Sequence, residues 1–180
     1  MSAFLAHRTV GFVVAQHGVD ERELIGPRDA ARAAGATTVL IAPALGSVTT
    51  TNEGAPHGSH RVDWTIEASE SRNVDALVLP DGEQNSRALR GDEGVVQLIR
   101  EFAGAGKPLG AFGYSVLSLM DAGVVGERNV TSSPSLRAEL VRAGARWHDR
   151  RVVVDRNLIT SRDARDVAAF NTQLMAYLDR

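Results

Sequence analysis

The sequence predicts an α/β fold in which helices cover both faces of a mostly parallel central sheet. Three short apolar runs, at residues 9–15, 37–43 and 75–80, are rich in β-branched residues or Leu and end near Gly, Pro or a polar residue. Continuous apolar runs of this length are typical of parallel strands buried on both faces. Helical patterns alternate with these and later strands, and this alternation predicts a doubly wound sheet.

The first helix is expected between the first two strands, within residues 20–36. Asp20 is suited to cap its N-terminus, acidic residues fill its first turn, and Gly35 is suited to end it. With its flanking strands this helix forms a βαβ unit. Pro27 lies inside the pattern, so a kink or a helix restart is expected there.

The later elements follow in the same alternating order. Residues 46–73 are polar, with Gly and Pro, and predict an excursion that holds short strands near 47–50 and 60–63. The remaining pattern predicts a helix at 92–105, a strand at 108–112 that runs into a helix, a helix from about Ser133 or Ser135, two short strands joined at 155–157, and a C-terminal helix from 166.

Length and composition predict one globular domain spanning residues 1–180, because the chain is long enough for one buried core and too short for two comfortable ones. The net charge of −2 gives no reason to expect nucleic acid or a membrane surface as a partner. The N-terminus lacks a secretory pattern and no run of about 20 apolar residues occurs, so a cytoplasmic location is expected. The absence of cysteine excludes disulfides, thiolate metal sites and thiol nucleophiles.

Residues 107–123 predict a buried strand, a tight turn and then a helix. Many α/β enzymes place an exposed nucleophile at such an elbow, because the turn lifts one side chain clear of the sheet and close to helix N–H groups. Here the apex is Gly113. Covalent catalysis needs an attacking atom, so no catalytic residue is assigned.

Four stretches carry a resemblance to a known family: ERELIGPRDAARAAGATTVLIAP, DALVLPDG, GKPLGAFGYSVLSLMDAGVVGERNVTSSPSLRAELVRAGARWHDRRVVVDRNLITSR and DVAAF. Over nearly its whole length the chain resembles the PfpI-like intracellular proteases of the class I glutamine amidotransferase-like superfamily. That superfamily includes the parkinsonism-associated deglycase and the C-terminal domain of large-subunit catalases. The resemblance implies a flavodoxin-like sandwich, a homodimer or larger homo-oligomer, and a stress-related role that no residue here indicates.

The same resemblance implies where a pocket should lie. The family elbow ordinarily reads cysteine, histidine, glycine, whereas this sequence has Gly113, Tyr114 and Ser115. A family glutamate that faces the cysteine matches Glu23. A Pro-Gly-Gly turn that resembles an oxyanion hole matches residues 80–82, with an aspartate in place of one glycine. The implied degenerate binding pocket consists of Glu23, Asp81, Gly82, Gly113, Tyr114 and Ser115.

Each polar candidate has a chemical and a structural interpretation. Ser115 lies in the first helical turn and is expected to cap N–H groups rather than point into the pocket. Tyr114 is expected to form an aromatic lid, because a phenol with an ordinary pKa of about 10 is a poor base. Glu23 is either a buried carboxyl kept protonated near the elbow or a solvated acid in its first helical turn.

No metal or cofactor is expected. His57 and His60 are closely spaced, but the Gly and Pro around them disfavour the helix that a metal site of this spacing needs. His17 follows the first strand and is expected to face solvent. Arg162 is expected to pair with Asp166, four residues later.

Three functions are compatible with these residues. The first is a protein without the family's thiol chemistry, either a pseudoenzyme or a small-ligand-binding protein. The second is a cysteine-independent hydrolase or lyase that uses Glu23 with Tyr114, aided by backbone amides near Gly82 and Gly113. The third is a purely structural domain, like the catalase C-terminal domain, with a pocket closed by Tyr114.

Overall fold

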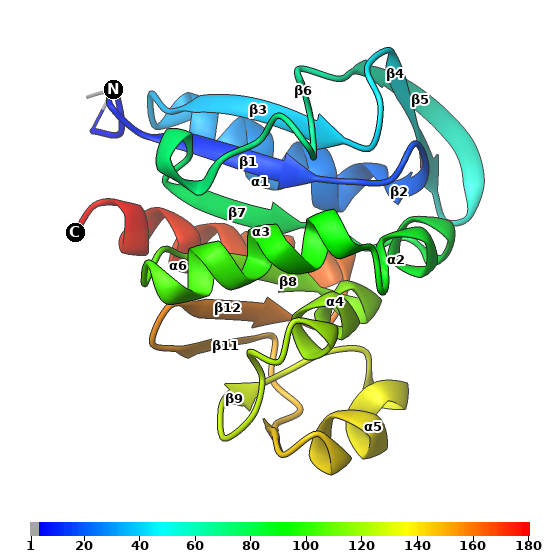
Figure 1. Cartoon of the computed structure of the whole chain (residues 1–180), viewed down its shortest axis with the longest axis vertical. Coiled ribbons are helices and arrows are strands. Elements are labelled where there is room, and N and C mark those ends of the chain that lie inside the picture. The colour runs from blue at the N-terminus through cyan, green and yellow to red at the C-terminus, as the bar shows by residue number, and fades with distance from the viewer. Residues whose placement is uncertain (1–3) are drawn as a thin grey trace.

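A computed structural model describes residues 4–180 and contains a central seven-stranded sheet (Figure 1). The strand order is β11-β12-β8-β7-β1-β3-β6, and all neighbours are parallel except β11 and β12. The strands are β1 (Thr9–Val13), β3 (Thr37–Ala42), β6 (Trp64–Thr65), β7 (Ala76–Leu79), β8 (Leu109–Phe112), β11 (Val152–Asp155) and β12 (Leu158–Ser161). The expected mostly parallel sheet and flavodoxin-like class are confirmed.

One face of the sheet is covered by α1 (Glu21–Ala33) and α6 (Val167–Leu178) (Figure 1). Phe112 of β8 and Phe170 of α6 are fully buried, with ring centroids 4.2 Å apart. Burying two aromatic rings removes a large apolar area from water. This contact fixes the end of β8, from which the predicted elbow starts.

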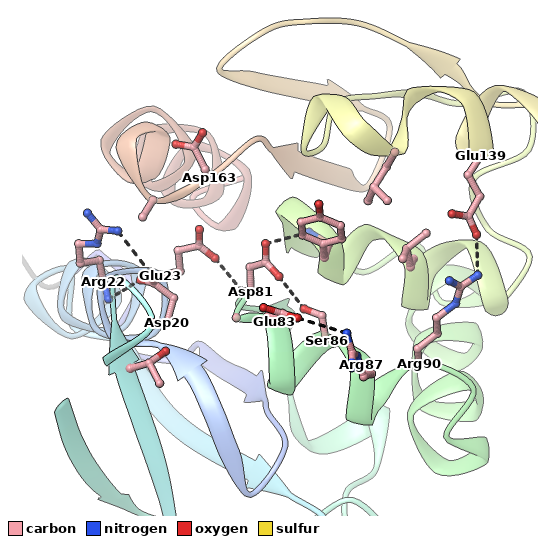
Figure 2. Close-up of a pocket in the computed structure, with 17 residues that line it drawn as sticks. Asp20, Arg22, Glu23, Asp81, Glu83, Ser86, Arg87, Arg90, Glu139 and Asp163 are labelled. Atoms are coloured by element: carbon pink, nitrogen blue, oxygen red, sulfur yellow. Dashed lines mark hydrogen bonds and ion pairs between the residues drawn. The ribbon is translucent and has the colours of Figure 1, made fainter. Parts of the chain in front are cut away.

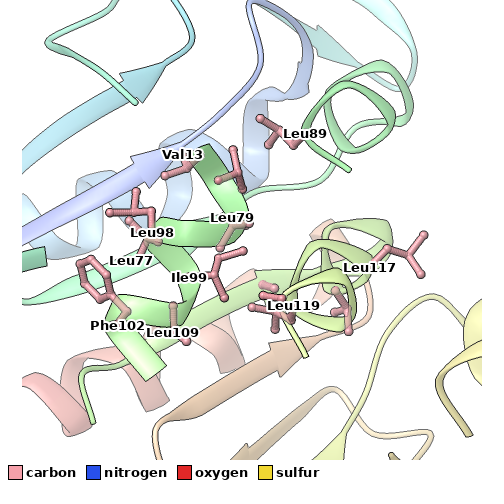
Figure 3. Close-up of a cluster of buried hydrophobic side chains, with 14 of the residues drawn as sticks. Val13, Leu77, Leu79, Leu89, Leu98, Ile99, Phe102, Leu109, Leu117 and Leu119 are labelled. Carbon is pink, nitrogen blue, oxygen red and sulfur yellow. The ribbon is translucent and has the colours of Figure 1, made fainter. Parts of the chain in front are cut away.

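The opposite face is covered by α3 (Glu93–Gly104) and α4 (Val116–Asp121). Ile99 of α3 and Leu119 of α4 belong to one buried cluster with Leu77 of β7 (Figure 3). Asp92 caps α3 by accepting a hydrogen bond from Val95 N over 2.9 Å. Helices on both faces, including the one expected at 92–105, are therefore confirmed.

The first helix starts where the sequence predicts. Asp20 accepts hydrogen bonds from the backbone N–H groups of Arg22 and Glu23, and Gly35, just beyond the C-terminus, has a φ of +95°. The helix runs through Pro27 without interruption, so the expected restart is wrong. Proline removes only one intrahelical N–H bond, and packing on the sheet holds the remaining turns together.

The polar excursion forms a second sheet with the order β2-β4-β5. Its strands are β2 (His17–Asp20), β4 (Ser47–Asn52) and β5 (Ala55–Arg61). The strand near 47–50 is confirmed, whereas the strand expected at 60–63 begins earlier, because Glu53 and Gly54 both have positive φ and make a tight hairpin turn. β2 was not predicted.

The remaining short elements lie near the C-terminal half of the sheet. They are α2 (Glu83–Leu89), α5 (Arg137–Arg142), β9 (Asn129–Val130) and β10 (Arg146–Trp147). The helix expected near Ser133 consists of a 3-10 turn, Pro134–Leu136, followed by α5. β11 and β12 meet at Arg156, which has a φ of +52°, as the expected joint at 155–157 requires.

Two expectations concern the chain as a whole. Within residues 4–180, no helix is long and apolar enough to cross a membrane. The interpretation of the N-terminal segment includes residues 1–3, which lie outside the described residues.

Candidate functional site

A pocket of about 760 Å³ lies next to residues that follow the ends of β7, β8 and β12 (Figure 2). Asp81 follows β7, Tyr114 follows β8 and Asp163 follows β12, while Glu23 reaches the pocket from α1. In parallel α/β sheets, ligands bind at this carboxyl edge. Of the six predicted pocket residues, Glu23, Asp81, Gly82 and Tyr114 line the pocket, whereas Gly113 and Ser115 do not.

The elbow is a 3-10 turn, Gly113–Ser115, between β8 and α4. Gly113 has a φ of +47°, a left-handed conformation that glycine adopts freely and other residues adopt at a cost. A Cβ placed on Gly113 would overlap Asp81 Oδ2 and would lie 3.2 Å from the carbonyl oxygen of Arg162. The backbone of an elbow is present, and the Asp81 carboxyl fills the space where an apex side chain would begin.

Two hydrogen bonds hold Asp81 in this position. Tyr114 N donates to Asp81 Oδ2 over 2.9 Å, and Ser86 Oγ lies 2.6 Å from Asp81 Oδ1 (Figure 2). The N–H after an elbow apex is the group that stabilises a substrate oxyanion in elbow enzymes. Because Asp81 already occupies the Tyr114 N–H, the expectation that an amide near Gly113 is available as an oxyanion donor is wrong.

Glu23 lies beside Asp81 and is only 2% exposed. Its Oε2 accepts a hydrogen bond from Asp81 N over 2.7 Å (Figure 2). Burial and the neighbouring Asp81 carboxyl raise the pKa of Glu23 well above its ordinary value of 4.5. Burial also raises the pKa of Asp81. The structure therefore supports the buried-carboxyl interpretation of Glu23, and the solvated interpretation is wrong.

A chain of buried hydroxyl groups lies behind the carboxyl pair. Ser86 Oγ is 2.6 Å from Asp81 Oδ1 and 2.8 Å from Ser115 Oγ, and Ser115 Oγ donates to Pro80 O over 2.7 Å. The Ser86 hydroxyl donates to the Asp81 carboxyl, a bond that favours the ionised form, while burial raises the pKa of Asp81 and outweighs it. Ser115 makes no capping hydrogen bond, because its hydroxyl is engaged here, so its predicted capping role is wrong.

Tyr114 lines the pocket and remains 42% exposed. Its hydroxyl lies 2.8 Å from Ser135 Oγ, in the 3-10 turn before α5. The hydroxyl is therefore engaged by this serine, and the ring does not close the pocket.

Gly82 fixes the turn that carries Asp81. It has a φ of +126°, and a Cβ there would overlap the carbonyl oxygen of Gly18. Asp20 N donates to Asp81 O over 2.8 Å across the same contact. Only glycine fits this close approach of two backbones.

The pocket rim carries arginines that sequence reasoning missed. Arg22, Arg87 and Arg90 all line the pocket. The pairs are Arg22–Asp20 at 3.5 Å, Arg87–Glu83 at 3.2 Å and Arg90–Glu139 at 2.6 Å. Two of these arginines and Ser86 belong to α2 or follow it directly, and no pattern in the sequence indicated that this short polar helix exists.

The other candidates lie outside the pocket. His60 lies on β5 and its Nε2 is 3.0 Å from Glu21 Oε2, while His17 is exposed. Across residues 4–180, no three His, Cys, Asp or Glu side chains are arranged to hold a metal ion. Arg162 pairs with Asp166 at 2.8 Å, as predicted.

The sequence matches the family model described as the DJ-1/PfpI family over residues 8–177. It is 32% identical over 160 residues to Protein/nucleic acid deglycase 2 of Escherichia coli (strain K12), covering 88% of this chain and 91% of that protein. It is 30% identical over 169 residues to General stress protein 18 of Bacillus subtilis (strain 168), covering 93% and 96% of the two chains. The resemblance found from the quoted stretches is confirmed.

Solved structures agree with this match. DJ-1beta of Drosophila melanogaster superimposes with a TM-score of 0.85 at 26% identity, covering 99% of this chain and 91% of that one. A ThiJ/PfpI domain protein of Brachyspira murdochii gives a TM-score of 0.88 at 19% identity, covering 95% and 96%; at that identity the likeness shows the fold alone.

Proposed function

Because this chain belongs to the DJ-1/PfpI family yet has no cysteine, we propose that it binds a small molecule at the elbow and performs no thiol chemistry. The observation that carries this proposal is the position of Asp81, whose carboxyl overlaps the place of an apex side chain. Several relatives are named deglycases. That activity is not carried over, because the family resemblance assigns it to the missing cysteine.

Ligand binding accounts for the site better than a purely structural role does. The pocket is about 760 Å³ and Tyr114 leaves it open, whereas a structural domain would gain by filling such a space with side chains. The buried carboxyl of Glu23 and the partly buried carboxyl of Asp81 also line the pocket, at a free-energy cost that packing alone would avoid. Homo-oligomer formation, a cytoplasmic location and a stress-related role rest on the family resemblance and stay predictions.

A second candidate function is a carboxyl-based hydrolase or lyase. It is favoured by the contact between Asp81 N and Glu23 Oε2 at 2.7 Å, which places two carboxyl groups side by side, both with raised pKa. A carboxyl with a raised pKa can donate a proton near neutral pH. Tyr114 would have to leave Ser135 to take part.

The two functions are separated by assays on the wild type, Glu23→Gln and Glu101→Gln, with methylglyoxal and a panel of chromogenic esters and peptides. Glu101 is exposed on α3, which contributes no lining residue, and serves as the matched control. We expect no turnover above background from any of the three proteins. Wild-type turnover that survives in Glu101→Gln and is abolished in Glu23→Gln would overturn the proposal and establish the carboxyl-based enzyme.

A further inference from the structure

Acidic side chains outnumber basic ones in the lining of the pocket. Six acidic side chains and three arginines line it, and each arginine already forms an ion pair with an acidic residue. Clefts with an excess of one charge concentrate ligands of the opposite sign and repel those of the same sign. Asp163 also pairs, with Arg165 over 2.6 Å, so within residues 4–180 the lining carboxyl groups without an ion pair are Glu23 and Asp81. A cationic ligand would favour their ionised form.

The carboxyl groups of Glu23 and Asp81 have no cationic partner in the part of the chain that the structure describes. Their hydrogen-bond partners are the N–H groups of Asp81 and Tyr114 and the hydroxyl of Ser86. Glu23 Oε1 accepts no hydrogen bond from any residue within 4–180, although the side chain is only 2% exposed. This oxygen is not among the buried side-chain atoms without a hydrogen-bond partner, which within residues 4–180 are Ser118 Oγ and Asn171 Oδ1. Glu23 Oε1 therefore opens onto the pocket, where a bound donor can reach it.

The backbone of Arg162 lies near the elbow, but its side chain pairs with carboxylates elsewhere. The carbonyl oxygen of Arg162 lies near the elbow, but its guanidinium donates to Asp149 and Asp166, each over 2.8 Å. The backbone of Arg162 thus adds another acceptor near the elbow, while its charge serves a different cluster.

We infer that the ligand is a small organic amine whose ammonium group binds between Glu23 and Asp81. This inference rests on the proposed function and specifies the class of ligand for the same pocket. An ammonium has several N–H donors, and Glu23 Oε1 and the Asp81 carboxyl can each accept one of them. An alcohol has one donor and no charge, and a carboxylate ligand has no N–H donor.

The rest of the pocket suits a carbon skeleton. Leu117, Leu136 and the exposed ring of Tyr114 line the side that α4 and the turn before α5 provide. Apolar groups there gain by leaving water, and an aromatic ring adds attraction for a nearby cation. The ligand therefore combines one ammonium group with an alkyl or aryl chain.

Amine binding should release protons. In the free protein, no cation of residues 4–180 pairs with the two carboxyl groups, and burial raises the pKa of both. An ammonium favours the ionised carboxylates, so bound protons leave as the amine enters. A neutral alcohol produces no such release.

Isothermal titration calorimetry with hexylamine, hexan-1-ol and hexanoate tests the inference near neutral pH, in two buffers of different ionisation enthalpy. We expect hexylamine to bind at least about tenfold more tightly than hexan-1-ol, with release of about one proton, and hexanoate not to bind. Glu23→Gln and Asp81→Asn should each weaken hexylamine binding about tenfold. Glu101→Gln should bind like the wild type, and thermal melting should show that every variant is folded.

Several results would overturn the inference while leaving the proposed function standing. They are hexan-1-ol binding as tightly as hexylamine, hexylamine binding without proton release, and hexylamine binding unchanged in both carboxyl variants. No binding of any probe to folded wild type also overturns it. Failure of the proposed function has a different signature, namely the Glu23-dependent turnover described above.

Discussion

Two regions of this molecule hold carboxyl groups that are largely withdrawn from solvent, and the regions treat these groups in opposite ways. Asp155, at the end of β11, has a side chain that is 11% exposed. It accepts hydrogen bonds from Asn129 N at 2.7 Å, Asn129 Nδ2 at 2.8 Å and Arg128 Nε at 3.0 Å. Burial alone would raise the pKa of Asp155, but these partners outweigh burial and lower it.

The elbow pocket lacks the corresponding cation. Within residues 4–180, the hydrogen-bond donors to Glu23 and Asp81 are backbone N–H groups and a serine hydroxyl, and the pKa values of both carboxyl groups are raised. The difference teaches that burial does not by itself decide the charge of a carboxyl; its partners do. The chain completes the Asp155 site with its own arginine, and residues 4–180 supply no such cation to Glu23 and Asp81.

Removing the carboxyl from the completed site should have the largest effect. Asp155→Ala leaves Arg128 without its carboxylate partner, in a side chain that is only 11% exposed. We expect a loss of about 3 kcal/mol in the free energy of unfolding, measured by urea denaturation. A loss below about 1 kcal/mol, as is usual for a surface ion pair, would remove the contrast between the two regions.

A side chain at the elbow apex should have the next largest effect. Gly113→Cys puts a Cβ at a φ of +47° and onto Asp81 Oδ2, so we expect a loss of about 2 kcal/mol in stability. Adding Asp81→Gly should recover more than half of that loss, and a double-mutant cycle measures the coupling. Strictly additive effects would mean that Asp81 does not hold the apex position.

The smallest effect concerns pH. The raised pKa of Glu23 means that the folded protein keeps a proton which the unfolded chain releases above 4.5. This contribution to stability is fully present below 4.5 and is lost as the pH rises through the folded-state pKa. Glu23→Gln removes the dependence, so the variant should gain about 1 kcal/mol over the wild type near pH 8 and nothing near pH 4.

Asp155→Asn is the matched comparison with the opposite sign. The lowered pKa of Asp155 contributes stability above its ordinary value of 3.8, and that stability is lost as the pH falls through the folded-state pKa. The stability advantage of wild type over Asp155→Asn should therefore shrink in acid. The measurement is urea unfolding at a series of pH values. If the stability differences from wild type of Glu23→Gln and Asp155→Asn changed with pH in the same way, the raised pKa of Glu23 and the lowered pKa of Asp155 would both be contradicted.

Local pattern was sufficient for most of the fold. The apolar runs at 9–15 and 75–80 became β1 and β7 because continuous apolar residues suit a strand buried on both faces. The helix α2 was missed because its seven residues, Glu83–Leu89, carry no apolar stripe. Its place is fixed by contacts with distant residues, such as the hydrogen bond that Ala15 N donates to Asn85 Oδ1. A local pattern does not contain such contacts.

The site was predictable in position but not in chemistry. The family resemblance placed Glu23 and the elbow together, and the structure brings them to one pocket. The aspartate at position 81 was recognised only as a replacement for a glycine of the family turn. Its carboxyl enters the elbow because Gly113 has no Cβ, and this depends on two residues that are far apart in sequence and meet only in the folded chain.

The Asp81 carboxyl occupies the space that a side chain at position 113 would need. This overlap limits which single substitutions the elbow can accept. A cysteine at position 113 meets the Asp81 carboxyl, and loss of Asp81 alone leaves an elbow with neither a thiol nor a carboxyl. A cysteine elbow without this overlap therefore needs two substitutions, Gly113→Cys and the loss of the Asp81 side chain. If Gly113→Cys comes first, it strains the fold, and if the loss of Asp81 comes first, it brings no thiol. The Asp81 carboxyl therefore disfavours a change of Gly113 to cysteine.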